Sequence, residues 1–311
     1  MTMLLSGFVY RCSNFEGCYT LAEDDLKQYV QYSWRYIRVL NLNHCYWLNQ
    51  RCLQFAIKKC RNLQQLHIIQ CNLSTTLLVS LLADLSELRS LSFSTDSFVN
   101  IKKETFNPAR ETLKNLTSVC IYYSSRELAV MNYLGEQSTL LDFCENLEEL
   151  VINSAEISIP ELCRPVFSKP KKLETIKSMS LSSNIHAAAN LLFYSTLAVL
   201  AHLQIPLEKL LMPNVNFAKF SQKPEYRDCL KNVSELRYLD ISGSFQPVDG
   251  TILNITSARH LRYYNVSRTK ITSQHLADVA SSCRNLTSLN IFECSHAFFE
   301  VRNSDSADSC M

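Results

Sequence analysis

Cysteine and histidine are the residues of this chain whose side chains could do chemistry. Its 311 residues include 13 cysteines and seven histidines, which could hold zinc or act as nucleophile and base. The neighbours His44 and Cys45 and the pair Cys12 and Cys18 are the zinc candidates, yet no Cys-x2-Cys or His-x3-His pair completes either set. Structural zinc sites draw their ligands from such closely spaced pairs. We therefore expect no metal and no cofactor.

Catalytic motifs are also missing from the sequence. It contains no Gly-x-Ser-x-Gly, His-Glu-x2-His or Walker loop. Only 5 glycines supply the backbone freedom that phosphate-binding loops need. No histidine has the spacing of a nucleophile–base pair. The sequence therefore predicts that the chain is not an enzyme.

Six of the cysteines belong instead to a repeat. Residues 60–73 and 283–294 share the order Cys-x2-Leu-x2-Leu-x-Ile-x2-Cys. The unit Leu-x2-Leu-x-Leu-x2-Cys/Asn recurs in about ten copies, and leucine-rich repeats run about 20 to 29 residues. Leu63 and Leu88 are 25 residues apart, whereas Leu116 and Leu147 are 31 apart, so the middle copies are longer. The copies begin at Ile37, Leu63, Leu88, Leu116, Leu147, Ile176, Leu207, Leu236, Leu261 and Leu286. For the sixth copy, Leu173 offers a competing register.

Each copy must supply a short strand, a turn and a helix. Alternate strand residues point inward, so the three apolar positions surround a strand. Residues 50–60 and 273–283 then carry apolar residues at helical spacing, with Ser273 as an N-cap. A helix over 20–34, capped by Thr20, is expected to cover the first copy. These elements predict an α/β leucine-rich-repeat solenoid, with a curved parallel sheet on its concave face and helices on its convex face.

Charge and cysteine usage limit the partners and the compartment. The formal net charge is +2, and the basic clusters are too short and scattered for a nucleic-acid footprint. No run of about 18 apolar residues exists, so we expect no membrane partner. An odd number of cysteines in buried repeat positions suits a reducing compartment. We therefore expect a cytoplasmic or nuclear protein.

Six Asn-x-Ser/Thr sequons leave an extracellular receptor ectodomain as an alternative. Residues 1–10 have no basic start and only a short apolar run, unlike a signal peptide. We favour the intracellular interpretation, because the repeats themselves use Asn, Ser and Thr often. The sequons lie at Asn72, Asn115, Asn232, Asn254, Asn265 and Asn285.

The repeat resembles the cysteine-containing leucine-rich repeats of F-box proteins. The resemblance rests on Cys-x2-Leu-x2-Leu-x-Leu-x2-Cys and covers about 250 residues. It is strongest from Ala22 to Leu91, where Cys45-Tyr46-Trp47-Leu48 is the sharpest match. Membership of this family implies a non-catalytic substrate receptor of an SCF (Skp1–cullin–F-box) ubiquitin ligase, which presents a target for ubiquitination and proteasomal degradation.

The domain order departs from that family at the beginning of the chain. Residues 1–36 hold no Leu-Pro-x-Glu stretch and no recognisable F-box. Skp1 and cullin binding is therefore expected only of a longer form, and a fragment, an isoform or an incomplete gene model would explain the sequence. The alternative is a leucine-rich-repeat scaffold that recruits no ligase. We expect residues 37–294 to form the solenoid and residues 295–311 a disordered Ser/Asp tail.

A target protein is expected on the concave face, at the strand positions that point away from the core. Ile69 and the serines of the third copy, such as Ser92, are expected there too. Tyr238, Tyr263 and Phe292 would form an aromatic ladder typical of recognition surfaces, although such residues can also merely stabilise neighbouring strands. The candidate residues are Asn41, His67, Tyr238, Asp240, Tyr263, Asn265, Asn290 and Phe292.

Overall fold

The computed structural model describes the repeats in two compact units. Described are residues 11–94, 103–123, 140–154, 175–183, 206–214, 233–243, 247–248, 255 and 258–294. The units are Met1–Leu147, called unit 1, and Glu148–Met311, called unit 2. The predicted Ser/Asp tail at 295–311 lies outside the described residues.

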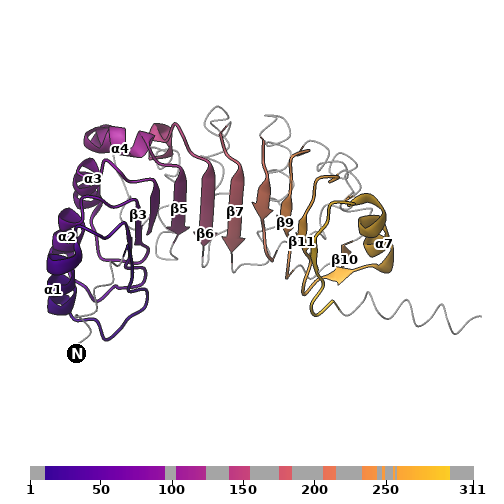
Figure 1. Cartoon of the computed structure of the whole chain (residues 1–311), viewed down its shortest axis with the longest axis horizontal. Helices are drawn as coiled ribbons and strands as arrows, with labels where there is room; N and C mark the ends of the chain where they lie inside the picture. Colours follow the sequence, from indigo (N-terminus) through magenta and orange to yellow (C-terminus); the bar gives the residue numbers. More distant parts are fainter. Residues whose placement is uncertain are drawn as a thin grey trace, which may run out of the picture. The chain divides into compact units, whose positions relative to one another are not determined.

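Unit 1 is a parallel sheet with helices along one side (Figure 1). The strands pair in chain order because each copy adds one strand beside the previous one. They are β1 (Cys12–Asn14), β2 (Val39–Asn41), β3 (Gln65–Ile68), β4 (Ser90–Ser94) and β5 (Ser118–Tyr123). The helices are α1 (Glu23–Ser33), α2 (Gln50–Lys59), α3 (Thr75–Ala83) and α4 (Arg110–Lys114), with the 3-10 helices η2 (Lys103–Ala109) and η6 (Leu141–Phe143).

Unit 2 repeats the same parallel arrangement. Its strands are β6 (Glu149–Ser154), β7 (Ser178–Ser183), β8 (Lys209–Leu211), β9 (Tyr238–Asp240), β11 (Tyr263–Asn265) and β13 (Ser288–Asn290). Helix α7 (Ser273–Ser282) follows β11, and β10 (Pro247–Val248) pairs with β12 (Lys270–Ile271). The predicted α/β leucine-rich-repeat fold is confirmed.

The strand register confirms all ten copies. The second apolar residue of each copy pairs with that of the next copy within the same unit, so these side chains stack in one row beneath the sheet. The sixth copy has the predicted register, since Met179 pairs with Leu150 and is fully buried. In unit 1 the row is Leu40, Leu66, Leu91 and Val119; in unit 2 it is Leu150, Met179, Leu210, Leu239, Tyr264 and Leu289.

One further strand precedes the first predicted copy. Strand β1 pairs with β2 and places Ser13 opposite Leu40, in the apolar row. Ser13 is nevertheless only 3% exposed, because its hydroxyl and the Tyr29 hydroxyl form a hydrogen bond of 2.8 Å. A polar residue at an apolar position hid this strand from the sequence pattern.

Helix beginnings follow the predictions only in part. Helix α2 begins at Gln50 as expected, and the Asn49 side chain accepts a hydrogen bond from the Cys52 amide at 2.8 Å. The prediction of Ser273 as N-cap was wrong, because the cap of α7 is Thr272, one residue earlier. The prediction of Thr20 was also wrong, since α1 starts after Ala22 without a side-chain cap. In both cases the cap is the extended residue directly before the helix; in α7 the Thr272 hydroxyl also accepts from the His275 amide at 3.2 Å.

The repeat cysteines are packing residues with a hydrogen bond. The thiols of Cys45, Cys71 and Cys294 lie 3.2, 2.9 and 3.0 Å from a carbonyl oxygen of the preceding copy. That carbonyl belongs to the third apolar residue, and the acceptors are Phe15, Leu42 and Val266. Burial raises the pKa of the Cys71 thiol to about 12, so the thiol is protonated and donates at neutral pH. The cysteines of the described residues are free thiols.

A left-handed residue stands directly before the Cys/Asn position in seven copies. Its φ lies between 54° and 72°, and the side chain that follows it is buried at Cys45, Thr269 and Cys294. In the three longer middle copies the equivalent residue still lies in the strand. The seven residues are Gly17, His44, Gln70, Asn214, Gly243, Arg268 and Glu293.

Candidate protein-binding face

The strand residues that point away from the core form what we call the open face of each unit. In unit 1 it includes Asn14, Glu16, Val39, Asn41, Asn43, Gln65, His67, Ser90, Ser92 and Ser94; in unit 2 it includes Tyr238, Asp240, Ser242, Tyr263, Asn265, Ser267, Ser288, Asn290 and Phe292. The alternation of buried and accessible residues along β1, β2 and β9 confirms their direction.

Ile69 occupies the same position in its copy as Asn43 and Ser94 do in theirs. It is only 7% exposed, so its side chain offers little surface to a partner. Its backbone amide donates a hydrogen bond to Asn43 Oδ1 at 2.8 Å, which holds the Asn43 side chain in place on the face. Ser92 and Ser94 lie on the face but are each 5% exposed.

Hydrogen bonds hold the polar side chains of unit 1 in place. Asn41 Nδ2 donates to Glu16 Oε2 at 3.0 Å, and Asn41 Oδ1 accepts from the Asn43 amide at 3.0 Å. His44 Nδ1 lies 2.7 Å from Gln70 Oε1, and His44 Nε2 lies 4.0 Å from Glu16 Oε1. Four polar side chains are thereby fixed before any partner arrives. Such pre-organisation reduces the entropy that binding must remove.

His67 lies beside this network, on strand β3. Its Nδ1 is 2.7 Å from the Ser92 hydroxyl, which sits on the next strand. Burial lowers the pKa of His67 below its usual value, and the Glu16 carboxylate opposes that shift. At neutral pH the ring is therefore uncharged and takes part in binding as a polar, not an ionic, group.

The open face of unit 2 contains an aromatic pair beside a hydrogen-bonded polar pair. Tyr238 and Tyr263 occupy paired positions, and their ring centroids are 6.0 Å apart. Two residues further along the same strands, Asn265 Nδ2 donates to Asp240 Oδ2 at 2.9 Å. Asn265 is only 8% exposed, so its contribution is to orient the Asp240 carboxylate.

Phe292 does not belong to the aromatic row that the sequence predicts. Tyr263 pairs with Ser288, and the Phe292 carbonyl accepts from the Arg268 amide, which places Phe292 further along the face. Phe292 is 63% exposed, and its amide donates to Asn290 Oδ1 at 3.1 Å. The two tyrosines therefore lie together without it. The prediction was wrong because Phe292 stands four positions further along its copy than the tyrosines stand in theirs.

A second aromatic group, which the sequence did not single out, lies in unit 1. Tyr19 and Tyr46 each follow the Cys position of their copy, and both rings contact Trp47 at centroid distances of 5.0 and 5.3 Å. Tyr19 is 68% and Tyr46 62% exposed, while Trp47 donates to the Leu21 carbonyl at 3.0 Å. A tyrosine after the cysteine in two consecutive copies is the signal that could have revealed this cluster.

Metal-binding and membrane-spanning features are absent from the described residues. No cluster of three His, Cys, Asp or Glu residues suited to a metal occurs in that part of the chain. Cys45, one of the zinc candidates, instead donates to the Phe15 carbonyl. Within the same ranges, no helix has the length and apolarity needed to span a membrane.

Residues 26–125 match the family model described as F-box/LRR-repeat protein 18, LRR. The match covers less than half of the chain and shows that these residues are similar to the repeats of that family. The match spans β2 to β5 and includes Asn41, His67 and the Tyr46–Trp47 part of the aromatic cluster. It confirms the resemblance to the repeats of F-box proteins that the sequence indicated. No significant match is found among the curated proteins.

Solved structures share the fold at low sequence identity. The Drosophila Toll–Spätzle structure aligns with a TM-score of 0.50 at 15% identity, covering 78% of this chain and 29% of that chain. A Leptospira interrogans LRR protein aligns with a TM-score of 0.45 at 15% identity, covering 86% of this chain and 57% of that chain. The yeast Rad7–Elc1 complex aligns with a TM-score of 0.49 at 17% identity, covering 89% of this chain and 65% of that chain. The chain thus spans less than two thirds of each solved chain, and these likenesses concern the fold alone. Together with the family match, the fold supports a protein-binding leucine-rich-repeat domain, a class that typically serves as a non-catalytic scaffold.

Proposed function

We propose that this chain is the substrate-recognition part of an SCF ubiquitin ligase receptor, which holds a target protein for ubiquitination and degradation. The observation that carries the proposal is the match of residues 26–125 to the repeats of F-box/LRR-repeat protein 18. In that family an F-box binds Skp1, and the repeats bind the target. In this role the chain catalyses no reaction itself. It positions the target protein, and the other subunits of the ligase carry out the transfer of ubiquitin.

The open face is the surface that binds the target. In unit 1 its polar side chains are already fixed, with Asn41 bonded to Glu16 and His67 bonded to Ser92. In unit 2 Tyr238 is 44% exposed and rests against Tyr263. Paired tyrosines bury a large area on binding at a small cost in side-chain entropy.

Co-purification with Skp1 tests the ligase part of the proposal. This chain, and a version extended upstream in the same reading frame, are each expressed with tagged Skp1. We expect the extended version to retain Skp1. If neither version does, the ligase role is wrong, and a scaffold that binds targets without recruiting a ligase is the function that stands.

Proximity labelling tests the binding face. Replacing both tyrosines (Tyr238→Ala with Tyr263→Ala) should lower the labelling of specific neighbours at least fivefold. Gln274→Ala is the matched control, because Gln274 is exposed on helix α7, away from the strands. Equal labelling by the tyrosine variant and the control would rule out the open face of unit 2 as the contact surface.

The cytoplasm and the nucleus are the compartments we propose. Burial raises the pKa of Cys60 to about 12 and that of Cys45 to about 11, as suits thiols that stay reduced and packed. One sequon asparagine, Asn265, is 8% exposed and bonded to Asp240, so it cannot carry a glycan in the folded chain. Thiol counting on protein from a secretory host, with a glycosidase mobility assay, checks this: a glycosylated, disulfide-bonded product would favour an extracellular receptor.

A further inference from the structure

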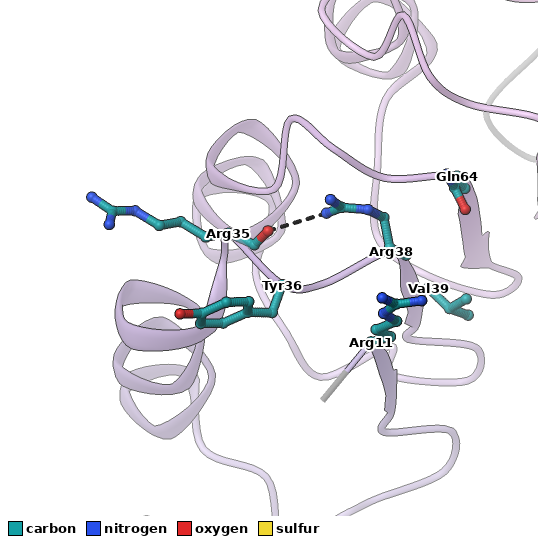
Figure 2. Close-up of a pocket in the computed structure, with 6 residues that line it drawn as sticks. All are labelled: Arg11, Arg35, Tyr36, Arg38, Val39 and Gln64. Atoms are coloured by element: carbon teal, nitrogen blue, oxygen red, sulfur yellow. Dashed lines mark hydrogen bonds between the residues drawn. The ribbon is translucent and has the colours of Figure 1, made fainter. Parts of the chain in front are cut away.

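A basic cavity lies where the first strands of unit 1 begin, at the edge of the open face, with which it shares Val39. Its volume is about 590 Å³, and none of the described residues that line it is acidic. Figure 2 shows the side chains of Arg11 and Arg38 extending from neighbouring strand starts, while Arg35 extends away from the other residues drawn. The lining residues are Arg11, Arg35, Tyr36, Arg38, Val39 and Gln64.

The repeat forces Arg11 and Arg38 together. Each directly precedes its strand, and the amides of Arg38 and Val39 donate to the Arg11 carbonyl at 2.8 and 3.0 Å. Neighbouring strands lie about 4.8 Å apart, so the two guanidinium groups start from adjacent points on the sheet edge. An anion that contacts both guanidinium groups would be attracted by two positive charges at once.

No such anion is supplied by the described part of the chain. Within those residues no carboxylate lies within the 4.0 Å of an ion pair with Arg11 or Arg38. Arg38 Nη1 donates to the carbonyls of Arg35 and Ile37, at 3.1 and 3.5 Å. These contacts use one of its nitrogens and hold the guanidinium at the rim of the cavity. The Arg35 guanidinium is turned onto the Trp34 ring, 5.2 Å from its centroid.

We propose that this cavity binds a phosphorylated side chain of the target protein, with Arg11 and Arg38 gripping the phosphoryl oxygens. A phosphoryl group carries nearly two negative charges at neutral pH, which balances two guanidinium groups. The planar guanidinium also binds oxyanions through two N–H groups at once. Tyr36 and Gln64 add neutral hydroxyl and amide groups to the lining. The inference rests on the proposed function and names the chemical class of its target.

Arg89 provides a matched control within the same unit. It also directly precedes its strand, and its Nη1 donates to the carbonyls of Ser86 and Leu88, as Arg38 does to Arg35 and Ile37. Its neighbours in the row are Gln64 and Thr117, so it stands as a single cation. Arg89→Gln therefore removes the same charge and the same backbone contacts without changing the paired arginines.

The test uses the full chain and fluorescent peptide libraries with a fixed central phosphoserine, serine or glutamate. We expect the phosphoserine library to bind at least tenfold more tightly than the other two. Arg11→Gln combined with Arg38→Gln should abolish that preference, and Arg89→Gln should leave it within twofold. Arg38→Lys keeps the charge but lacks the planar fork, so an intermediate loss is expected. The thermal midpoint of each variant confirms that it is folded.

Three results would overturn the inference: equal binding of the serine library, an equal loss with Arg89→Gln, or tighter binding to vesicles containing phosphatidylinositol phosphates than to phosphopeptides. The test is separable from that of the ligase role. If the chain binds phosphoserine but the extended version does not retain Skp1, only the proposed ligase role is refuted. If Skp1 is retained but phosphoserine does not bind, only the proposed phosphoryl-binding role of the cavity is refuted.

Discussion

The residues directly before the strands carry different sets of charges in the two units. In unit 1 this row contains Arg11, Arg38, Gln64 and Arg89, and no ion pair forms within it among the described residues. In unit 2 it contains Glu148, Lys177, Glu208, Arg237, Arg262 and Thr287. There Lys177 lies 2.9 Å from Glu148, and Arg237 lies 3.9 Å from Glu208. The unit 1 row has three cations and no carboxylate, whereas in unit 2 two of the three cations lie beside a carboxylate of the same row.

The backbone of this row is nevertheless the same in both units. The Arg38 carbonyl accepts from two amides of the next copy, at 2.7 and 3.0 Å. The Lys177 carbonyl does the same, at 2.8 and 3.0 Å. These backbone hydrogen bonds do not depend on the side chain, although the side chains of Arg38 and Arg89 add hydrogen bonds to carbonyls of the loop before them. The side chain of this row can therefore differ between copies while the strand pairing is kept.

If the cores of the two units contribute equally to stability, shortening an equivalent core side chain should destabilise the protein by a similar amount in either unit. Leu66 in unit 1 and Leu210 in unit 2 occupy the same row and are both fully buried. Leu66→Ala and Leu210→Ala should each lower the free energy of unfolding by about 2 to 5 kcal/mol. Leu289, in the same row but 40% exposed, should lose much less when changed to alanine. Urea denaturation measures all three, and a large loss only in one unit would contradict the equivalence.

Among the described residues, each unit has one glycine at the left-handed position, so the same substitution can be compared in the two units. Gly17 has φ +62° and open space where a Cβ would stand, whereas a Cβ on Gly243, at φ +72°, would collide with the Asn214 side chain. Gly17→Ala should cost about 1 to 2 kcal/mol through backbone strain alone. Gly243→Ala should cost more, but measured in an Asn214→Ala background, relative to Asn214→Ala alone, it should cost about as much as Gly17→Ala. Thermal unfolding tests this, and an unchanged cost in the double variant would show that the collision is irrelevant.

A pH dependence is expected on the open face of unit 1. Burial lowers the pKa of His67 in the folded chain below its unfolded value of about 6.5. The unfolded chain therefore binds a proton at His67 more readily than the folded chain does. The stability that the neutral His67 contributes is fully present above the unfolded pKa, and it is lost as the pH falls from the unfolded pKa toward the folded pKa. His67→Gln should therefore flatten the stability profile between about pH 7.5 and pH 5. Identical profiles for both proteins would show that His67 does not cause the dependence.

The smallest effect on stability is expected from the row itself. Arg38→Glu gives unit 1 an alternation like that of unit 2, by placing a carboxylate beside Arg11. Exposed ion pairs contribute about 0 to 1 kcal/mol, so the free energy of unfolding should change little. Phosphoserine binding should be lost completely. If that free energy changed by several kcal/mol instead, the side chain would be part of the fold, and the comparison between the two rows would fail.

Much of the fold was predictable because every copy buries the same three positions. Even the sixth copy has the predicted register, although Leu173 offered another. Strand β1 was missed because Ser13 stands where leucine was expected, and only the hydroxyl of Tyr29, sixteen residues away, makes its burial possible. A similar substitution occurs at Tyr264, whose hydroxyl lies 3.0 Å from His275 Nε2 in the core.

The sequence predicted which side chains of the candidate site point away from the core, but not which of them lie next to one another. Asn41, His67, Tyr238 and Asp240 point from the strands as the period of two requires. Phe292 was placed in the wrong row, because it lies beyond the end of β13 whereas the tyrosines begin their strands. The Tyr19–Tyr46–Trp47 cluster and the arginine cavity were missed, since both join residues of different copies.

The sequence by itself determined the repeat, its ten main copies and the buried role of the cysteines. It could do so because burial is imposed on each copy separately, by its own three apolar residues. Only the tertiary structure decided that Arg11 meets Arg38 and that Tyr238 meets Tyr263. Such neighbours are set by the register between copies, and the number of residues in each turn and helix controls that register.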